Sequence, residues 1–492
     1  MRRSLILLAA GLTVLRLIAG ASIHLTEDEA YYRLWAQHLQ LGYLDHPPMI
    51  AWWIRLGETI CGDNALGVRL LPALASGVTT WLIGDLAKRL GAQPRTALRA
   101  ALWYNATLTV CLGGMLATPD APASFFWTLT LWSLALFWER GGPVWWLAAG
   151  VAAGLAVLSK YSGLFLAPGV LLWLLVIPGG RAELRRPGPW EAAVLAIFVF
   201  AVNVVWNSEH HWVTFIKQFG RAEAHGLAPG RMVEFLATQL LLLTPLVTYF
   251  AFRGAWRGWR ERTQAGAVHL MLPLATSAPF AAYLLVHSLH DRVQGHWPVP
   301  LFGALAICAA VAAEPVLATA RGRWVGWAAP GFGLTIGAAA MALMIAPSVL
   351  PGRYDVTGAL RGWPGFADDI ERLRVGRGAG WVGVQSYGVL AQLDLTGRIA
   401  APVLQIIERE RYFPDPARRP DLSKPGVVVD LQRRLNAEDL AHCFAKVTPA
   451  GPLARAGGAV RNQRYSAFLV SGPVRDIRAL GCPMPDGRGG WR

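Results

Sequence analysis

The chain has 492 residues, of which 54% are hydrophobic and only 16% are charged, and its mean hydropathy is +0.36. An ordinary soluble domain carries roughly 25% charged residues, so this composition excludes a protein that is soluble throughout. The net charge of +15 could suggest a nucleic-acid partner. The cations, however, fall mainly in short loops between apolar segments, where they set membrane topology and contact anionic headgroups. We therefore expect an integral membrane protein that binds no nucleic acid.

Apolar runs of about 20 residues, the length that crosses a hydrocarbon core of roughly 30 Å, dominate residues 1–346. The first run follows Met1-Arg2-Arg3 and has the look of a signal peptide, with Ala19-Gly20-Ala21 as a cleavage site. Because the run continues to Leu25, it can span the membrane as it stands, and we interpret it as an uncleaved first helix. The eleven candidate spans are residues 4–24, 66–87, 100–117, 121–138, 144–159, 161–179, 189–206, 232–252, 266–287, 298–317 and 325–346.

The distribution of Lys and Arg predicts the orientation of these spans. With the N-terminus in the cytoplasm, the loops on that side hold most of the cations of the membrane region, as the positive-inside rule requires. Residues 144–179 could instead be one long helix, but Lys160 interrupts the run, and a single span would place the basic loop between Arg253 and Arg262 outside. Two spans keep the rule, and an odd number of spans then places residues 347–492 in the periplasm of a bacterial cell.

The chain divides into a membrane domain, residues 1–346, and a soluble domain, residues 347–492. The second part has mixed charges, a helix-like segment at 366–373 and strand-like segments at 381–386 and 426–431, which predicts a small α/β module. Its two cysteines, Cys443 and Cys482, could pair if this domain faces an oxidising compartment.

The first outer loop, residues 25–65, contains two amphipathic segments. Residues 29–40 place Tyr32, Trp35 and Leu39 on one helical face, which is typical of a helix that lies in the membrane interface. Residues 49–60 could form a second such helix. The tandem prolines that follow Asp45-His46 separate them, because proline cannot continue a helix.

Asp28 and Glu29 follow the first span at the outer surface. A carboxylate at this place could take the proton of a hydroxyl or amine acceptor, and the second acid could bind a metal or a substrate hydroxyl. The alternative is structural: Thr26 or Asp28 would cap the helix that follows, and acids are favoured in a first helical turn. From the pair alone, the cap is the better interpretation.

The remainder of the first outer loop and the other outer loops contain further acids and cations. Together they are what a polyprenyl-phosphate-linked sugar would require, since cations bind the phosphate leaving group and acids handle acceptor and sugar. Each one alone is better explained as a solvated loop charge or a snorkelling anchor. These residues are Asp45, His46, Asp120, Lys160, Tyr161, Asn207, Glu209, His210, His211, Lys217, Arg221, His290, Asp291, Arg292 and His296.

The sequence contains no regular metal or nucleotide motif. A divalent metal could be bound by His24, Asp28, Glu29, Asp45 or His46, or by His210 and His211, but no HExxH or comparable ligand spacing is present. No glycine-rich phosphate loop stands between a strand and a helix, which argues against direct use of a nucleotide sugar or ATP.

At these residues the sequence resembles the glycosyltransferase family 39-like membrane enzymes of the GT-C class, the bacterial relatives of protein O-mannosyltransferases and of the lipid A aminoarabinose transferase. The resemblance covers about the first 300 residues and is only general beyond Pro347. It is carried by residues 26–53 (TEDEAYYRLWAQHLQLGYLDHPPMIAWW), 67–74 (GVRLLPAL), 118–120 (TPD), 154–163 (GLAVLSKYSG) and 291–301 (DRVQGHWPVPL).

The resemblance implies a GT-C fold. With the segments described above, we expect a mainly α transmembrane bundle of about eleven spans and a small periplasmic α/β domain. The resemblance also implies an inverting transfer of a sugar from a polyprenyl-phosphate donor to lipid A or its core, to another glycolipid or to a protein, at the outer face of the bacterial inner membrane. Asp28 would be the general base and Glu29 would support it. His46, which stands where relatives carry a Lys, would bind the donor phosphate with Lys160, Arg292 and His296. Sugar or acceptor contacts would come from Asp45, Asp120 and Tyr161.

A transporter or flippase for a lipid-linked sugar is the alternative from a different class. Transporters tend to show repeated halves and charged or broken helices near the bilayer midplane. Here the spans are nearly free of acids, and Arg16 is one of few cations deep within a helix. The polar groups collect on one membrane face, which favours catalysis at the surface over passage. A membrane scaffold would leave this collection of acids and cations unexplained.

Overall fold

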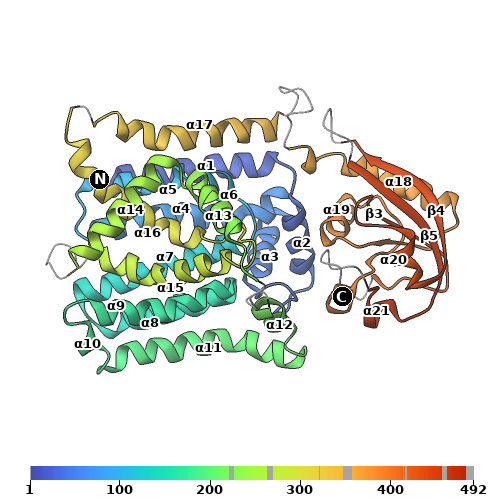
Figure 1. Cartoon of the computed structure of the whole chain (residues 1–492), viewed down its shortest axis with the longest axis horizontal. Coiled ribbons are helices and arrows are strands. Elements are labelled where there is room, and N and C mark those ends of the chain that lie inside the picture. The colour runs from blue at the N-terminus through green and yellow to red at the C-terminus, as the bar shows by residue number, and fades with distance from the viewer. Residues whose placement is uncertain are drawn as a thin grey trace. The chain divides into compact units, whose positions relative to one another are not determined.

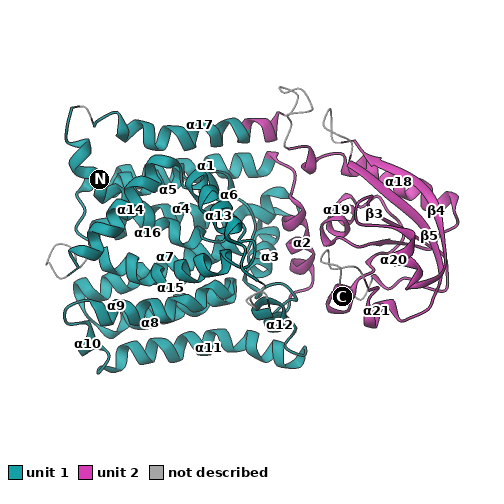
Figure 2. Cartoon of the chain, in the orientation of Figure 1, with its two compact units in different colours: residues 1–21, 40–341 teal, residues 22–39, 342–492 magenta. Residues whose placement is uncertain are grey.

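The computed structural model describes residues 2–220, 226–262, 270–320, 322–346, 357–413, 415, 418–456 and 463–483 (Figure 1). The chain forms two compact units (Figure 2). Unit 1 comprises residues 1–21 and 40–341, and unit 2 comprises residues 22–39 and 342–492. The predicted boundary at 346/347 is therefore close to the unit boundary at 341/342, while the first part of the first outer loop belongs to the same unit as the C-terminal residues.

Unit 1 is helical. Its α-helices are α1 (Arg2–Ser22), α3 (Met49–Cys61), α4 (Ala65–Arg89), α5 (Pro94–Ala106), α6 (Leu108–Gly113), α7 (Asp120–Arg140), α8 (Pro143–Ser159), α9 (Leu166–Val176), α10 (Gly180–Glu183), α11 (Pro187–Glu209), α12 (Val213–Gly220), α13 (Pro229–Leu242), α14 (Pro245–Arg260), α15 (Met271–Ser288), α16 (Phe302–Leu317) and α17 (Val325–Ile345). Two 3-10 helices, η1 (Tyr161–Phe165) and η3 (Val299–Leu301), precede α9 and α16.

Within the described residues, six helical segments are long and apolar enough to cross a membrane. They are α1, α4, α7, α11, the segment Val299–Leu317 and α17. Helices α13 and α14 form a further candidate if they are one span, although they are bent by 106° at their junction, where Pro245 starts α14 without a backbone N–H. The prediction of a multi-pass helical membrane protein is confirmed, whereas the count of eleven spans stays a prediction.

The predicted interruption at Lys160 is present. Helix α8 ends at Ser159, Lys160 has an extended backbone with φ −159° and ψ 139°, and η1 begins at Tyr161. The segments on either side, α8 and the run Tyr161–Val176, are apolar but shorter than the long spans. The chain therefore turns at Lys160 instead of continuing as one helix.

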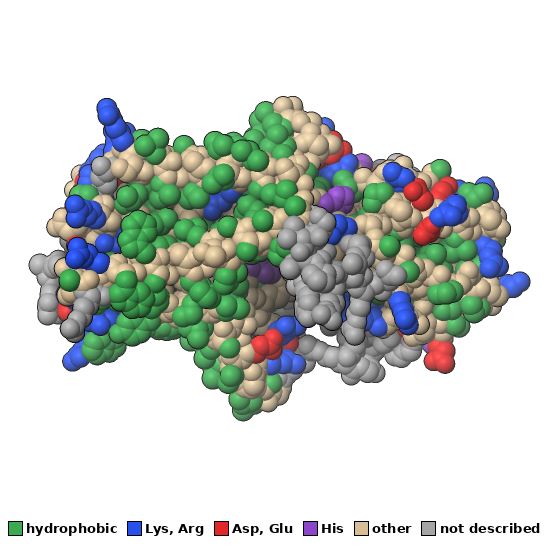
Figure 3. All heavy atoms as spheres, turned by 90° about the horizontal axis from the view of Figure 1, so that it is seen from above, with side chains coloured by type: hydrophobic (Ala, Val, Ile, Leu, Met, Phe, Trp, Pro, Cys, Tyr) green, Lys and Arg blue, Asp and Glu red, His purple; other side chains and the backbone are tan. Residues whose placement is uncertain are grey.

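The outer surface of unit 1 is apolar, as contact with lipid requires. On α11 the side chains of Val194, Ile197 and Phe198 are 67%, 69% and 75% exposed, and hydrophobic side chains spread along unit 1 in the space-filling view (Figure 3). A soluble monomer rarely exposes such a continuous apolar surface. Lys and Arg side chains gather instead at one end of unit 1 (Figure 3), the end that contains α10 and the chain's N-terminus (Figure 1).

Small residues allow the helices of unit 1 to pack closely. A Cβ atom on Gly150 of α8 would lie 2.4 Å from the carbonyl oxygen of Ala192 on α11, and one on Gly254 of α14 would lie 2.2 Å from that of Cys308 on α16. Because lipid is as apolar as leucine, helices in a membrane associate through such close packing rather than through a hydrophobic effect. A larger side chain at either glycine would force these helix pairs apart.

Unit 2 contains one five-stranded sheet. Its strands are β1 (Trp381–Val384), β2 (Val403–Gln405), β3 (Gly426–Leu431), β4 (Phe444–Arg455) and β5 (Gln463–Pro473), in the order β2-β1-β3-β5-β4. Strand β1 is parallel to β2 and β3, while β5 pairs antiparallel with β3 and β4. Its helices are α2 (Glu27–Gln37), α18 (Trp363–Gly376), α19 (Tyr387–Thr396), α20 (Ala437–Ala441) and α21 (Ile477–Leu480), with the 3-10 helices η6 (Gly358–Leu360) and η7 (Glu408–Tyr412). The predicted α/β module is confirmed.

The prediction that one face of α2 lies in the membrane interface is wrong. Tyr32 and Trp35 are only 7% and 1% exposed, so this face is buried within the protein and does not contact lipid. Leu39, at 51% exposure, lies beyond the end of the helix. The heptad-like spacing of aromatic residues indicates a buried face and a lipid-facing one equally well, since both need apolar side chains.

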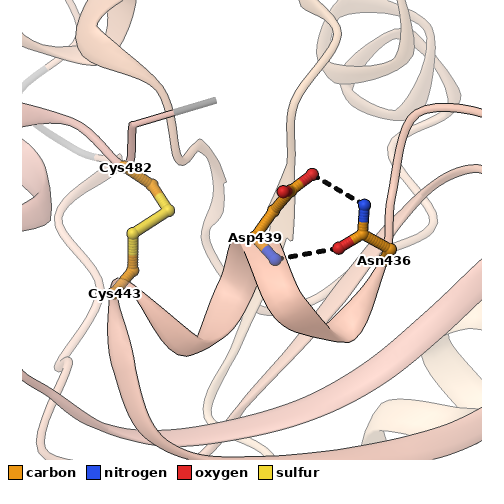
Figure 4. The surroundings of a disulfide bond; sticks show 4 residues. All are labelled: Asn436, Asp439, Cys443 and Cys482. Atoms are coloured by element: carbon orange, nitrogen blue, oxygen red, sulfur yellow. Dashed lines mark hydrogen bonds between the residues drawn. A yellow bond between two sulfur atoms is a disulfide. The ribbon is translucent and has the colours of Figure 1, made fainter. Parts of the chain in front are cut away.

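Cys443 and Cys482 are joined by a disulfide bond, with their Cα atoms 5.7 Å apart (Figure 4). Both are buried. Cys443 follows the short helix α20, which Asn436 caps by accepting a hydrogen bond of 2.8 Å from the backbone N–H of Asp439. A disulfide that closes a loop of this size stabilises a fold by roughly 3 to 4 kcal/mol in the chain-entropy model. The pairing considered from the sequence is therefore present.

Burial makes one acid of unit 2 sensitive to pH near neutrality. Glu410 in η7 is 6% exposed, and its burial raises its pKa to about 7, although its carboxylate accepts a hydrogen bond of 2.9 Å from the backbone N–H of Gln405. Because the pKa of Glu410 is higher in the folded than in the unfolded state, the protonated side chain contributes to stability. This contribution is complete below the unfolded pKa of about 4.3 and is lost as the pH rises through about 7. We expect the unfolding free energy of unit 2 to fall by up to roughly 3 kcal/mol across this window.

Hydrogen exchange of the backbone amides of η7 and β2 in the intact protein, corrected for the intrinsic exchange rate at each pH, measures this change in unfolding free energy. Glu410→Gln should flatten the dependence between pH 5 and 8, while Glu438→Gln, at an exposed position of α20, should leave it unchanged. An equal pH dependence in wild type and Glu410→Gln would contradict the assignment.

Candidate active site

A capping box starts α2. The hydroxyl of Thr26 accepts a hydrogen bond of 3.2 Å from the backbone N–H of Glu29, and the Glu29 carboxylate accepts bonds of 3.0 Å from the backbone N–H and 3.1 Å from the hydroxyl of Thr26. Such reciprocal bonds satisfy donors that would otherwise be orphaned at a helix start. Glu29 is fully buried. The capping interpretation therefore applies to Thr26 and Glu29, and Glu29 supports the helix rather than facing solvent.

Asp28, one residue earlier, has a different environment. It is exposed, and its Oδ1 atom accepts a hydrogen bond of 2.8 Å from the hydroxyl of Tyr387, the first residue of α19. Two adjacent acids thus differ in environment: Glu29 is a buried cap, and Asp28 is an accessible carboxylate that accepts a hydrogen bond from a tyrosine hydroxyl. Sequence reasoning missed Tyr387, which carries no local motif and lies 359 residues further along the chain.

In unit 1, residues 40–48, here called the Asp45 loop, are fixed by side chains of α11 and α12. The amide of Asn203 donates a hydrogen bond of 2.9 Å to the carbonyl of Leu41, and the hydroxyl of Thr214 donates one of 2.8 Å to the carbonyl of Tyr43. Both donors are fully buried. Asn203 lies within the apolar run of α11, and a polar side chain inside a membrane span is itself a signal of function that the sequence analysis did not use.

The conformation of the Asp45 loop also depends on Gly42 and Trp206. The indole N–H of Trp206 donates a hydrogen bond of 2.9 Å to the side chain of Gln40, and a Cβ atom on Gly42 would lie 2.5 Å from the Trp206 ring. Only glycine leaves room for the ring at this place. The loop is therefore held on both sides of Leu41.

Asp45 is paired with a cation. Its carboxylate accepts a hydrogen bond from Lys217 of α12, and its backbone carbonyl accepts one from the side chain of Gln218. Asp45 is 9% exposed. Because a buried acid is tolerated only when it is paired, this ion pair orients the loop and keeps a cation beside it.

Asp120 is the centre of a second group of charges. Lys160 donates a hydrogen bond of 2.7 Å to its Oδ1 atom, and Nε2 of His296 lies 3.6 Å from its Oδ2 atom. His46 lies near enough to contribute to the electrostatic environment of this carboxylate. We call these four residues the Asp120 cluster. They come from four separate segments of the chain, so the structure brings together residues that the sequence predicted only to share one membrane face.

Helix dipoles favour the charges of this cluster. Asp120 is the first residue of α7, where the positive end of the helix dipole stabilises an acid, and Lys160 directly follows the C-terminus of α8, where the negative end stabilises a cation. The acid and cation then neutralise each other. The two histidines add positive charge to the cluster when they are protonated.

Two predicted site residues have other partners. The hydroxyl of Tyr161 donates a hydrogen bond of 2.9 Å to the Asn203 side chain, so it supports the Asp45 loop. Arg292 forms an ion pair of 3.0 Å with Glu234, and both side chains are exposed. The ion pair of Arg292 is therefore with an acid outside the Asp120 cluster.

Among the residues that the structure describes, no group of three or more His, Cys, Asp and Glu side chains has the arrangement of a metal site. The described polar residues of the candidate site supply carboxylates, an ammonium group and imidazoles. An exposed carboxylate can accept a proton, and the cations can bind an anionic leaving group.

The chain is similar in sequence to several known proteins. Residues 45–206 match a family model described as dolichyl-phosphate-mannose-protein mannosyltransferase. The chain is 28% identical over 317 residues to lipid A galacturonosyltransferase RgtD of Rhizobium johnstonii, which covers 62% of this chain and 65% of the relative. It is 27% identical over 324 residues to undecaprenyl phosphate-alpha-4-amino-4-deoxy-L-arabinose arabinosyl transferase 1 of Pseudomonas fluorescens, covering 57% of this chain and 56% of the relative.

The fold has a solved counterpart. The structure of ArnT from Cupriavidus metallidurans bound to undecaprenyl phosphate superposes with a TM-score of 0.62 at 17% identity, over 94% of this chain and 97% of that one. The chain resembles the GT-C membrane glycosyltransferases in sequence and in fold. The family model includes the Asp45 loop from Asp45 onward together with Asp120 and Lys160, while Asp28 lies before its first matched residue.

Proposed function

We propose that this chain is an inverting glycosyltransferase, which moves a sugar from a polyprenyl-phosphate donor to lipid A or its core, to another glycolipid or to a protein. The main support is the Asp120 cluster: an acid and three potential cations converge at the ends of α7 and α8. Both curated relatives reported above are named transferases. A transporter has no comparable support, so we do not propose one.

In the proposed reaction, Asp28 is the general base. Its carboxylate takes the proton of the acceptor's hydroxyl or amine as that atom attacks the anomeric carbon of the sugar from the side opposite the phosphate. The bond between the anomeric carbon and the phosphate oxygen breaks, its electron pair stays on the phosphate, and polyprenyl phosphate leaves. Attack and departure on opposite faces invert the configuration at the anomeric carbon.

The cations are proposed to stabilise the leaving group. Lys160, His46 and His296 would contact the phosphate as its negative charge increases, and oriented cations at such a point lower the barrier strongly. Arg292 would join them by exchanging Glu234 for the phosphate. Asp45 and Asp120 would orient the cations and bind sugar or acceptor hydroxyls, with Tyr161 holding the loop. Glu29 would support Asp28 through the capping box.

The base is tested by Asp28→Asn, which keeps the shape of the side chain and removes its basicity. Membrane glycolipids from cells that lack the protein are compared by mass spectrometry with those from cells that produce wild type or the variant. We expect a mass increment with wild type that falls by roughly 10²- to 10⁴-fold, the range for general base catalysis, with Asp28→Asn. Asp369→Asn, a change at an exposed ion pair of α18, should keep the increment. A normal increment with Asp28→Asn at equal protein level would refute the base.

The donor site is tested by Lys160→Met, which keeps the length of the side chain without its charge. The loss of one charge-assisted hydrogen bond to phosphate should weaken the binding of undecaprenyl phosphate to the purified protein by roughly 10- to 100-fold. Lys446→Met, at an exposed position of β4, is the control. Unchanged affinity in Lys160→Met would remove this residue from the phosphate site.

The same titration with a chelator tests whether a divalent metal takes part in donor binding. If it does, removing the metal should weaken the binding of undecaprenyl phosphate.

We also propose the orientation predicted from the sequence: eleven spans, the N-terminus in the cytoplasm and residues 347–492 in the periplasm of a bacterial inner membrane. The count treats α5 with α6, and α13 with α14, as single spans. Two features support it. Lys and Arg gather at the end of unit 1 that contains the N-terminus (Figure 3), and the Cys443–Cys482 disulfide fits an oxidising compartment.

Reporter fusions test this topology. A phosphatase that is active only outside the cytoplasm should be active when fused after Gly352 and inactive when fused after Arg262, in the loop proposed to be cytoplasmic. The reverse pattern would invert the orientation, and activity at both points would require a different number of spans.

A further inference from the structure

The segment that carries Asp28 belongs structurally to the C-terminal domain. Residues 22–39 form one compact unit with residues 342–492 (magenta in Figure 2), although more than 300 residues separate them in sequence. The side chain of Gln392, on α19, donates a hydrogen bond of 2.8 Å to the backbone carbonyl of Leu25, and both residues are buried. The chain that enters α2 is thus fixed by α19.

Ion pairs fix the remainder of α2. Arg33 contacts Asp394 of α19 at 3.3 Å, and Asp394 also pairs with Arg418. Arg418 in turn contacts Asp415 at 2.8 Å, and His38 at the end of α2 lies 3.6 Å from the same carboxylate. These charges form a connected network with little exposed surface, which holds better than an isolated surface pair. Both ends of α2 are therefore attached to the C-terminal domain.

The position of Tyr387 is set by the sheet. Tyr387 follows the end of β1, and the preceding turn is held by Asp430 at the end of β3, whose Oδ2 atom accepts hydrogen bonds of 2.9 Å from the backbone N–H of Gln385 and 2.8 Å from that of Ser386. Asp430 is fully buried. Since β1 and β3 are parallel, this turn lies at the carboxyl edge of the strands, the place where open α/β sheets present functional groups.

The ring of Tyr387 is also held. It packs against Tyr31 of α2, with ring centroids 4.7 Å apart, and the guanidinium of Arg409 lies 4.8 Å from its centroid. With the ring held by these contacts, the hydroxyl reaches Oδ1 of Asp28 at 2.8 Å. The bond to Oδ1 orients the carboxylate and leaves Oδ2 to take the proton of an acceptor.

We propose that Tyr387 is a positioning residue, through which the C-terminal domain orients the carboxylate of Asp28 for catalysis. This inference rests on the proposed function, because it needs Asp28 to be the base. A catalytic group must be held close to its reacting geometry, and small misplacements cost about two orders of magnitude in rate. The C-terminal domain is thereby a part of the catalytic apparatus and not only a binding appendage.

The test is Tyr387→Phe in the full-length protein, which keeps the ring contacts to Tyr31 and Arg409 and removes only the hydroxyl. The glycolipid mass increment formed at equal protein level should fall by roughly 10- to 100-fold, the range for losing one hydrogen bond to a charged group. Binding of undecaprenyl phosphate to the purified variant and hydrogen-exchange protection of α2 should stay as in wild type. Tyr412→Phe, a tyrosine of η7 whose contact is with Arg411, is the matched control and should keep the full increment.

A double-mutant cycle separates positioning from a structural effect. Asp28→Glu moves the carboxylate away from the Tyr387 hydroxyl, and in that background Tyr387→Phe should cause no further loss. If the two substitutions reduce the glycolipid increment independently, the positioning role is overturned. It is also overturned if Tyr387→Phe weakens the binding of undecaprenyl phosphate or lowers the hydrogen-exchange protection of α2. A full increment with Tyr387→Phe while Asp28→Asn abolishes it would overturn this inference and leave the proposed function intact. A full increment with Asp28→Asn would instead overturn the proposed function.

Discussion

An ionised side chain at the centre of a bilayer costs about 2.5 to 3.5 kcal/mol on insertion scales, and this cost determines where the charges of unit 1 lie. Asp120 and Lys160 are at helix ends, where they pair with each other and where the dipoles of α7 and α8 favour their signs. Arg16, buried within α1, is compensated by a hydrogen bond of 2.7 Å to the side chain of Asn105. Placing Asp120 and Lys160 together at helix ends thus meets the requirement of the membrane and also supplies the charges of the proposed phosphate site.

The two acids at the start of α2 show how one short sequence can satisfy both folding and chemistry. Glu29 completes a capping box and is buried, so its carboxylate stabilises the helix. Asp28 is left exposed beside it, with its orientation set by Tyr387. The cap therefore belongs to Thr26 and Glu29, which leaves Asp28 available for the proposed role of base.

The sheet domain of unit 2 is connected to this acid by its own fold. Asp430 of β3 accepts hydrogen bonds from the turn that follows β1, and Tyr387 directly follows this turn as the first residue of α19. The network from Arg33 through Asp394 to Arg418 holds α2 against the same domain.

Local pattern in the sequence determined much of this protein. Runs of about 20 apolar residues predicted the helices of unit 1, the interruption at Lys160 was visible as a cation inside such a run, and alternating segments predicted β1 and β3, because these features depend on neighbours in the chain. Only the tertiary structure decided which polar residues meet. It paired Asp120 with Lys160 and His296, turned Arg292 to Glu234, buried the aromatic face of α2 and brought Tyr387 to Asp28. Contacts between distant segments depend on how helices and strands pack, and a pattern of spacing along the chain carries no record of that packing.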